Sequence, residues 1–74
     1  MDKTLLDTMV EAVKAHAQAN YERDGWDYVV ECWDDAEIAA TLREQGCTSV
    51  AQALRTVGKI VGVHDSVHRD IRGA

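Results

Sequence analysis

Two histidines and two cysteines are the residues of this chain best suited to hold a metal ion. His64 and His68 lie four residues apart, the spacing at which one face of a helix presents two imidazoles to the same ion. Cys32 and Cys47 could complete a two-cysteine, two-histidine zinc site. However, the cysteines lack the C-x-x-C spacing, and His64 falls near the centre of an apolar stripe, where a histidine is more often packed in a core. We therefore expect no metal and no cofactor, and keep this zinc site as an alternative.

Carboxylates form the second group of reactive side chains. Eight acids and two bases lie between residues 22 and 44. Asp34 and Glu37 have the spacing of a helix capping box, which gives two of the acids a structural role. No nucleophile stands in a glycine-flanked elbow, and no glycine-rich phosphate loop is present. A domain of 74 residues also has little room to enclose a substrate pocket of roughly 300 Å³ or more. We expect the protein not to be an enzyme.

The acids that capping leaves unexplained give a candidate binding surface. Asp27, Glu31 and Asp35 are interleaved with the two tryptophans of the chain, Trp26 and Trp33. We expect the tryptophans to fill the gap between two long helices and the three acids to line the outer face. We predict that a protein partner binds there, the alternative being that the acids are only solvated.

The charge of the chain is unevenly distributed. Residues 1–44 carry eleven acids and four bases, whereas residues 45–74 carry two acids and four bases, for a total of −5. This division suits a protein or basic partner better than nucleic acid. An acidic domain could also occupy the nucleic-acid groove of another protein. A phage inhibitor of a host nucleic-acid enzyme, of the anti-CRISPR or DNA-mimic type, is therefore an alternative function.

Residues 37–55 have the form of two helices joined by a short turn at Gly46, which is typical of a DNA-binding helix-turn-helix regulator. The second helix would carry the basic residues Arg55, Lys59, Arg69 and Arg72. The pattern fits poorly, because Leu42 stands where a small residue is expected and only Gln52 and Arg55 could reach bases. A net charge of −5 also opposes attraction to phosphate. This regulator is an alternative, and we do not expect nucleic acid to be the partner.

Two long helices are predicted to position these residues. The first spans residues 2–22, started by Asp2 or Thr4, with an apolar stripe at three- and four-residue intervals. Its members are Leu6, Met9, Val10, Val13, Ala17 and Asn20 or Tyr21. The second runs from Val50 to Ile71, started by Ser49 with Gln52 completing a capping box. Gly58 and Gly62 interrupt it, either where another helix backbone approaches closely or at a bend.

The segment between the long helices is predicted to hold two short elements. Asp24 and Gly25 end the first helix and start the next. Residues 26–33 place Trp26, Val29, Val30 and Trp33 on one face of a short helix, the fallback being a strand that pairs across a dimer. Asp34 starts a third helix that runs to about Gln45, with Ile38, Ala39 and Leu42 inward, and Gly46 closes it.

The stretch YERDGWDYVVEC, residues 21–32, resembles a group of small bacterial and phage proteins. The matching residues are Tyr21, Glu22, Gly25, Trp26, Asp27, Val29, Val30, Glu31 and Cys32. The resemblance covers under a quarter of the chain. It implies a bacterial or phage origin and brings no activity with it.

We predict a single all-α domain over residues 1–74, a small helical bundle of three to four helices, two of them long and one or two short. Apolar surface left on the Val50–Ile71 helix would favour a homodimer. The chain has no apolar run of about 18 residues, so we expect no membrane association and a cytoplasmic location. The predicted function is protein–protein interaction or regulation without catalysis.

Overall fold

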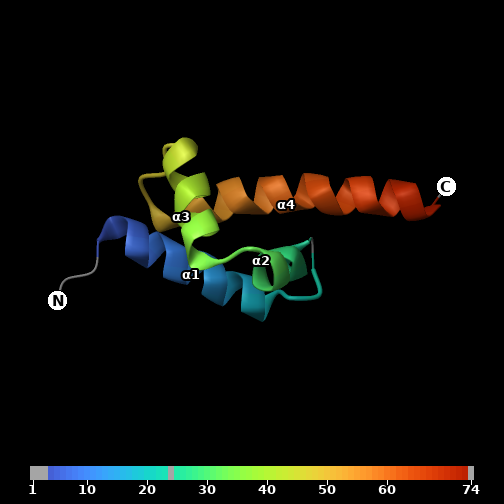
Figure 1. The fold of residues 1–74 in the computed structure, drawn as a ribbon, viewed down its shortest axis with the longest axis horizontal. Coiled ribbons are helices and arrows are strands. Elements are labelled where there is room, and N and C mark those ends of the chain that lie inside the picture. Colours follow the sequence, from blue (N-terminus) through green and yellow to red (C-terminus); the bar gives the residue numbers. More distant parts are fainter. Residues whose placement is uncertain (1–3, 24, 74) are drawn as a thin grey trace.

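The structure is a computed structural model that describes residues 4–23 and 25–73, with side chains described as far as residue 62. These residues form four helices and no strand: α1 (Leu5–Ala19), α2 (Trp26–Cys32), α3 (Asp35–Glu44) and α4 (Val50–Gly73). The predicted all-α bundle, with two long and two short helices, is confirmed (Figure 1).

The first helix is the centre of the arrangement, because α1 packs against each of the other three helices. α2 lies beside the C-terminal half of α1, and α3 crosses steeply near the start of α4 (Figure 1). α4 continues well beyond the other helices at its C-terminal end, and the molecule measures 50 × 22 × 19 Å. The short helices therefore border α1 one after the other, α3 along its first half and α2 along its second.

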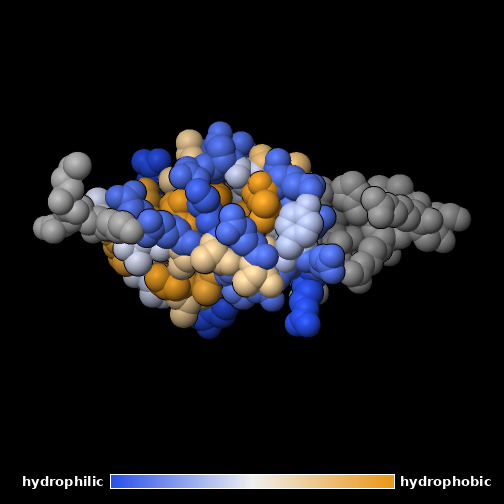
Figure 2. Space-filling view, turned by 90° about the horizontal axis from the view of Figure 1, so that it is seen from below, coloured by the Kyte–Doolittle hydropathy of each residue, from blue (hydrophilic) through white to orange (hydrophobic). Residues whose placement is uncertain are grey.

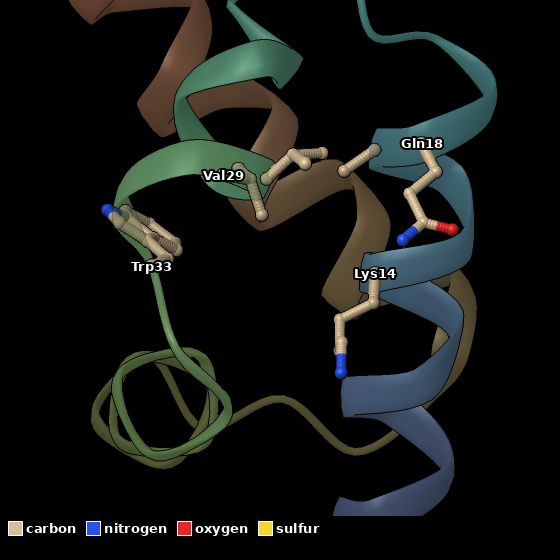
Figure 3. A pocket seen from close by; sticks show the side chains of 6 residues that line it. Lys14, Gln18, Val29 and Trp33 are labelled. Atoms are coloured by element: carbon tan, nitrogen blue, oxygen red, sulfur yellow. The ribbon is translucent and has the colours of Figure 1, made fainter.

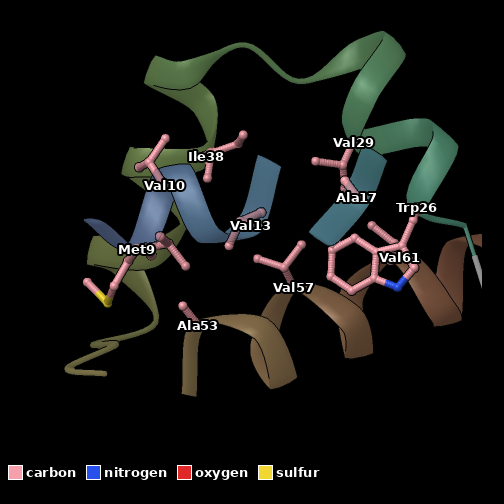
Figure 4. Close-up of a cluster of buried hydrophobic side chains, with 11 residues drawn as sticks. Met9, Val10, Val13, Ala17, Trp26, Val29, Ile38, Ala53, Val57 and Val61 are labelled. Atoms are coloured by element: carbon pink, nitrogen blue, oxygen red, sulfur yellow. The ribbon is translucent and has the colours of Figure 1, made fainter. Parts of the chain in front are cut away.

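All four helices contribute to one hydrophobic core (Figure 4). Its buried members are Met9, Val10, Val13, Ala17, Trp26, Val29, Ile38, Leu42, Ala53, Val57 and Val61. Within α1 and α4 these residues recur at three- and four-residue intervals, as the sequence stripe predicted. No buried polar or charged residue occurs among those described.

The first helix begins as expected but ends early. Thr4 is its N-cap: its hydroxyl accepts a hydrogen bond from the Asp7 N–H, and the Asp7 carboxylate accepts one from the Thr4 N–H. The predicted end at residue 22 is wrong, since α1 stops at Ala19 with Asn20 as its C-cap. The Asn20 side-chain amide donates to the His16 carbonyl at 2.9 Å, a local bond that competes with helix continuation.

The aromatic segment is a helix, so the alternative of a strand paired across a dimer is wrong. Gly25 starts α2 from the left-handed conformation, with φ of 83°, which only glycine adopts without strain. The predicted cap by Asp24 lies outside the described residues. Trp33 has extended backbone angles and ends α2 one residue earlier than expected.

Side-chain caps start the last two helices. The Asp34 carboxylate accepts a hydrogen bond from the Glu37 N–H at 2.8 Å and begins α3, as predicted, but the Glu37 carboxylate accepts none from the Asp34 N–H, so only half of the predicted capping box forms. The Ser49 hydroxyl accepts from the Gln52 N–H at 3.1 Å at the start of α4. The Gln52 side chain, however, accepts from the backbone and hydroxyl of Thr48 rather than from Ser49, so the predicted box is displaced by one residue.

The core closes around Trp26. Its indole meets the His16 ring of α1 edge to face, with the ring centroids 4.5 Å apart. On the opposite element, a Cβ added at Gly58 of α4 would lie 3.3 Å from the indole atom Cζ2. Gly58 therefore permits a close approach, as predicted, although a tryptophan ring and not a helix backbone makes it.

Candidate protein-interaction surface

Four of the five residues predicted for the binding surface reach solvent. Asp27 and Glu31 are exposed on α2, and Asp35 is exposed at the first position of α3. Trp33 is half-buried, whereas Trp26 is only 5% exposed and belongs to the core. Trp26 can therefore support the surface from beneath, but it offers almost no area to a partner.

Asp35 is held by a cation from another helix. Its carboxylate lies 2.8 Å from the Nζ atom of Lys14 on α1, and the two side chains are 70% and 46% exposed. Exposed pairs of this kind contribute little to stability and are screened by salt. The ion pair ties the start of α3 to α1 and removes part of the negative charge that the sequence suggested for this surface.

Glu31 also has an intramolecular partner, the phenol of Tyr21, which donates a hydrogen bond to the Glu31 carboxylate. This bond raises the pKa of Tyr21 above its ordinary value of 10.0, and the negative charges of Glu31, Asp27 and Glu22 raise the pKa further. Three carboxylates therefore act on one exposed aromatic ring. An aromatic face in negative surroundings suits a lysine or arginine side chain.

A small hollow of about 50 Å³ lies between α1 and α2 (Figure 3). Lys14 and Gln18 border it on α1, and Val29 and Trp33 border it on the other side. The Trp33 ring is set against Tyr28 edge to face, with the centroids 6.0 Å apart, which fixes its position. This volume is far below that of a small-molecule site and fits part of one side chain.

A wider and shallower hollow, of about 400 Å³, lies between α1 and α3. Its lining combines three carboxylates with three small or aliphatic side chains: Asp7, Val10, Glu11, Asp35, Ala36 and Ala39. Seen from the side of α1 and α2, apolar surface lies between hydrophilic side chains (Figure 2). The face is thus mixed in character, with apolar and hydrophilic side chains next to one another.

Sequence reasoning missed three residues of this surface. Val30 was expected on the inner face of α2 but is 40% exposed, and Tyr21, expected on the α1 stripe, is 38% exposed. The helix ends before Tyr21, and so the stripe no longer constrains it. No sequence pattern indicated Lys14, because it comes next to Asp35 only in the folded chain.

Only two residues of the alternative zinc site, Cys32 and Cys47, have described side chains. Cys32 is exposed at the end of α2, and Cys47 donates a hydrogen bond to the Thr56 hydroxyl with an Sγ–O distance of 3.6 Å. The side chains of His64 and His68 lie outside the described part of the chain. Among the side chains that are described, no three histidine, cysteine or acidic groups gather as metal ligands.

The two helices that the helix-turn-helix alternative requires are present, but one of the two side chains expected to reach bases is hydrogen-bonded within the chain. α3 and α4 are joined by a turn at Gly46, as that alternative requires. However, the Gln52 side-chain oxygen, one of the two groups expected to reach bases, accepts two hydrogen bonds from Thr48. Arg55 is exposed and unaffected.

Comparison with protein-family models, with curated proteins and with solved structures finds no match for this chain. None of the helices, over the residues described, has the length and apolar character needed to cross a membrane.

Proposed function

We propose that this protein works by binding another protein through the surface formed by α1 and α2, without catalysis. The observation that carries the proposal is the exposed side chain of Val30 in the lining of the hollow that Trp33 also lines, together with exposed Tyr21 in a neighbouring hollow that shares Gln18 with it. Tryptophan and tyrosine are enriched among the residues that contribute most to binding at protein interfaces.

The electrostatic surroundings indicate the chemistry of the partner. Glu22, Asp27 and Glu31 place negative charge around Tyr21, which supports a partner with lysine or arginine at that position. Asp27 makes no hydrogen bond or ion pair within the part of the chain that the structure describes, and its carboxylate is exposed. It is therefore the acid of the predicted face most available to a cation.

Affinity capture of partner proteins from a lysate of the parent cell, with this protein as the bait, tests the proposal. Val30→Asp places a charge at the edge of the hollow, and Ala40→Asp makes the same kind of change at an exposed position of α3 outside the hollows. We expect wild type and Ala40→Asp to retain the same partner and Val30→Asp to lose it. If Val30→Asp, still folded by circular dichroism, retains the partner as well as Ala40→Asp does, the α1–α2 surface is not the binding site.

A further inference from the structure

The solvent-facing side of α4 carries basic and small residues. Ala51, Arg55, Lys59 and Gly62 recur at three- and four-residue intervals and so share one face of the helix, which we call the basic row. The first three of them are exposed, and the row lies on the side of α4 away from its buried residues. No acid occurs among residues 50–62, in contrast to the acidic first part of the chain.

Contacts within the described part of the chain do not account for the basic row. Neither Arg55 nor Lys59 forms a hydrogen bond or an ion pair there. A Cβ at Gly62 would meet nothing within 4 Å, whereas the absence of one at Gly58 makes room for Trp26. Glycine inside a helix is less favourable than alanine, so Gly62 has a cost that no described contact offsets. A glycine at the surface of a helix allows another helix to approach closely.

The exposed face of α2 carries a complementary set of side chains. Asp27, Val30 and Glu31 lie three and four residues apart on it, and we call them the acidic row. Asp27 and Glu31 are separated by four residues, as are Arg55 and Lys59. Because a helix rises about 1.5 Å per residue, each pair of charges spans about 6 Å along its helix. The two acids can therefore face the two bases at the same time.

The surroundings of the acidic row are negative as well. Arg23 is exposed in the turn before α2, but the acid next to it, Glu22, offsets its charge. The hydrogen bond to Glu31, and then the negative charges of Glu31, Asp27 and Glu22, raise the pKa of Tyr21. This end of the protein therefore attracts a positively charged surface, although a base lies nearby.

We infer that the acidic row of one copy of this protein lies on the basic row of a second copy, so that the protein associates with itself. The inference rests on the proposed function and deepens it by naming the partner as another copy of the chain. α2, about 10 Å long, fits within the basic row, which extends for about 16 Å from Ala51 to Gly62. The short residues at the two ends of the basic row leave space for the approaching helix, and Val30 adds apolar contact area.

The net charge of −5 on each copy does not prevent this contact. The molecule is 22 Å and 19 Å across in its two shorter dimensions, so the centres of two adjoining copies lie roughly that far apart. At about 0.1 M salt, charges interact over only about 10 Å. Repulsion between the total charges is therefore screened, whereas opposite charges in contact still attract. At about 1 M salt the range falls to about 3 Å, which should weaken the contact.

Sedimentation equilibrium of the purified protein at about 0.1 M salt tests the inference through charge reversal. Asp27→Lys and Lys59→Glu each place like charges across the contact. Glu44→Lys and Arg43→Glu are the matched controls, because they reverse exposed charges on α3 that belong to neither row. We expect wild type and both controls to associate, and the dissociation constant to rise about tenfold or more for Asp27→Lys and Lys59→Glu. Circular dichroism confirms that each variant is folded.

An equal mixture of Asp27→Lys and Lys59→Glu provides a sharper test than either variant alone. In the mixture the intact acidic row of one variant meets the intact basic row of the other, and the two reversed rows also carry opposite charges. We therefore expect the mixture to associate although each variant alone does so weakly. Unfolding or a general loss of solubility in the variants would not produce this recovery.

Four results would overturn the inference. The first is a wild type that stays monomeric up to about 1 mM. The second is association that Asp27→Lys and Lys59→Glu leave unchanged, and the third is a mixture that does not recover it. The fourth is a monomer that binds duplex DNA through Lys59, since the basic row would then serve nucleic acid. If the wild type is monomeric while Val30→Asp abolishes capture of a cellular protein, the proposed function stands and only the second copy fails.

Discussion

Gly58 of α4 lies against the indole of Trp26, and a Cβ at position 58 would stand 3.3 Å from Cζ2 of that ring. The ring cannot easily retreat, because His16 packs on it and only 5% of Trp26 is exposed. Glycine inside a helix costs about 1 kcal/mol relative to alanine. Here the cost is offset by the close packing of α2 onto α4.

Alanine substitutions at the two helix glycines should therefore have opposite effects. A Cβ at Gly62 would meet nothing within 4 Å, so Gly62→Ala should raise the free energy of unfolding by about 0.5–1 kcal/mol. Gly58→Ala should fail to gain this stability, which leaves it at least about 0.5 kcal/mol less stable than Gly62→Ala. Urea unfolding measures the free energy of unfolding of both variants and of the wild type. Equal stabilisation of the two variants would show that the Trp26 ring moves away from a Cβ at position 58 without lowering the free energy of unfolding.

The two tryptophans should differ in their importance for the fold. Trp26→Ala removes a buried ring from a core shared by α1, α2 and α4, at a cost of about 3–5 kcal/mol. A domain of this size has little more stability than that, so we expect far-UV circular dichroism to show a largely unfolded chain. Trp33→Ala loses a half-buried ring, at a cost of about 2 kcal/mol or less, and should stay folded. Equal loss of helix in the two variants would contradict this assignment.

The fold class was predictable from the sequence because it depends on local patterns. Stripes such as Met9–Val13–Ala17 and caps such as Asp34 are set by neighbouring residues, and both were confirmed. The surface was less predictable. Asn20 ended α1 early and freed Tyr21, and the pairing of Lys14 with Asp35 joins residues twenty-one positions apart, which no local pattern encodes. Hydrophobic spacing also could not tell Val29, which is buried, from Val30, which is exposed.

The neighbouring acids Asp34 and Asp35 should make different contributions to stability. Asp34 caps α3 through the Glu37 N–H, and its replacement by alanine should lower the free energy of unfolding by about 1 kcal/mol. Asp35 forms an exposed ion pair with Lys14, and Asp35→Ala should cost about 0.5 kcal/mol or less. Denaturation at low and high salt checks this, because only the Asp35 effect should fade as salt is added. A larger loss in the free energy of unfolding for Asp35→Ala than for Asp34→Ala would contradict this prediction.

The hydrogen bond from Tyr21 to Glu31 predicts a pH dependence in the alkaline range. Its pKa is raised in the folded protein above 10.0, so the stabilisation is complete below about pH 10 and is lost as pH rises through the folded pKa. Glu31→Gln removes the charged acceptor and should lower the Tyr21 pKa toward 10.0. Absorbance of tyrosinate during titration gives the pKa, and Tyr21→Phe identifies which of the two tyrosines titrates. An unchanged tyrosine titration in Glu31→Gln would refute the role of this bond.

The central claim is that the α1–α2 surface binds another protein, and site-specific photo-crosslinking in the parent cell tests it most directly. A photoreactive phenylalanine derivative at position 30 would stand at the edge of the hollow, and the same residue at exposed position 40 of α3 is the control. We predict one discrete crosslinked species of higher mass from position 30 and none from position 40. No crosslinked species from position 30, or the same species from both positions, would contradict the claim.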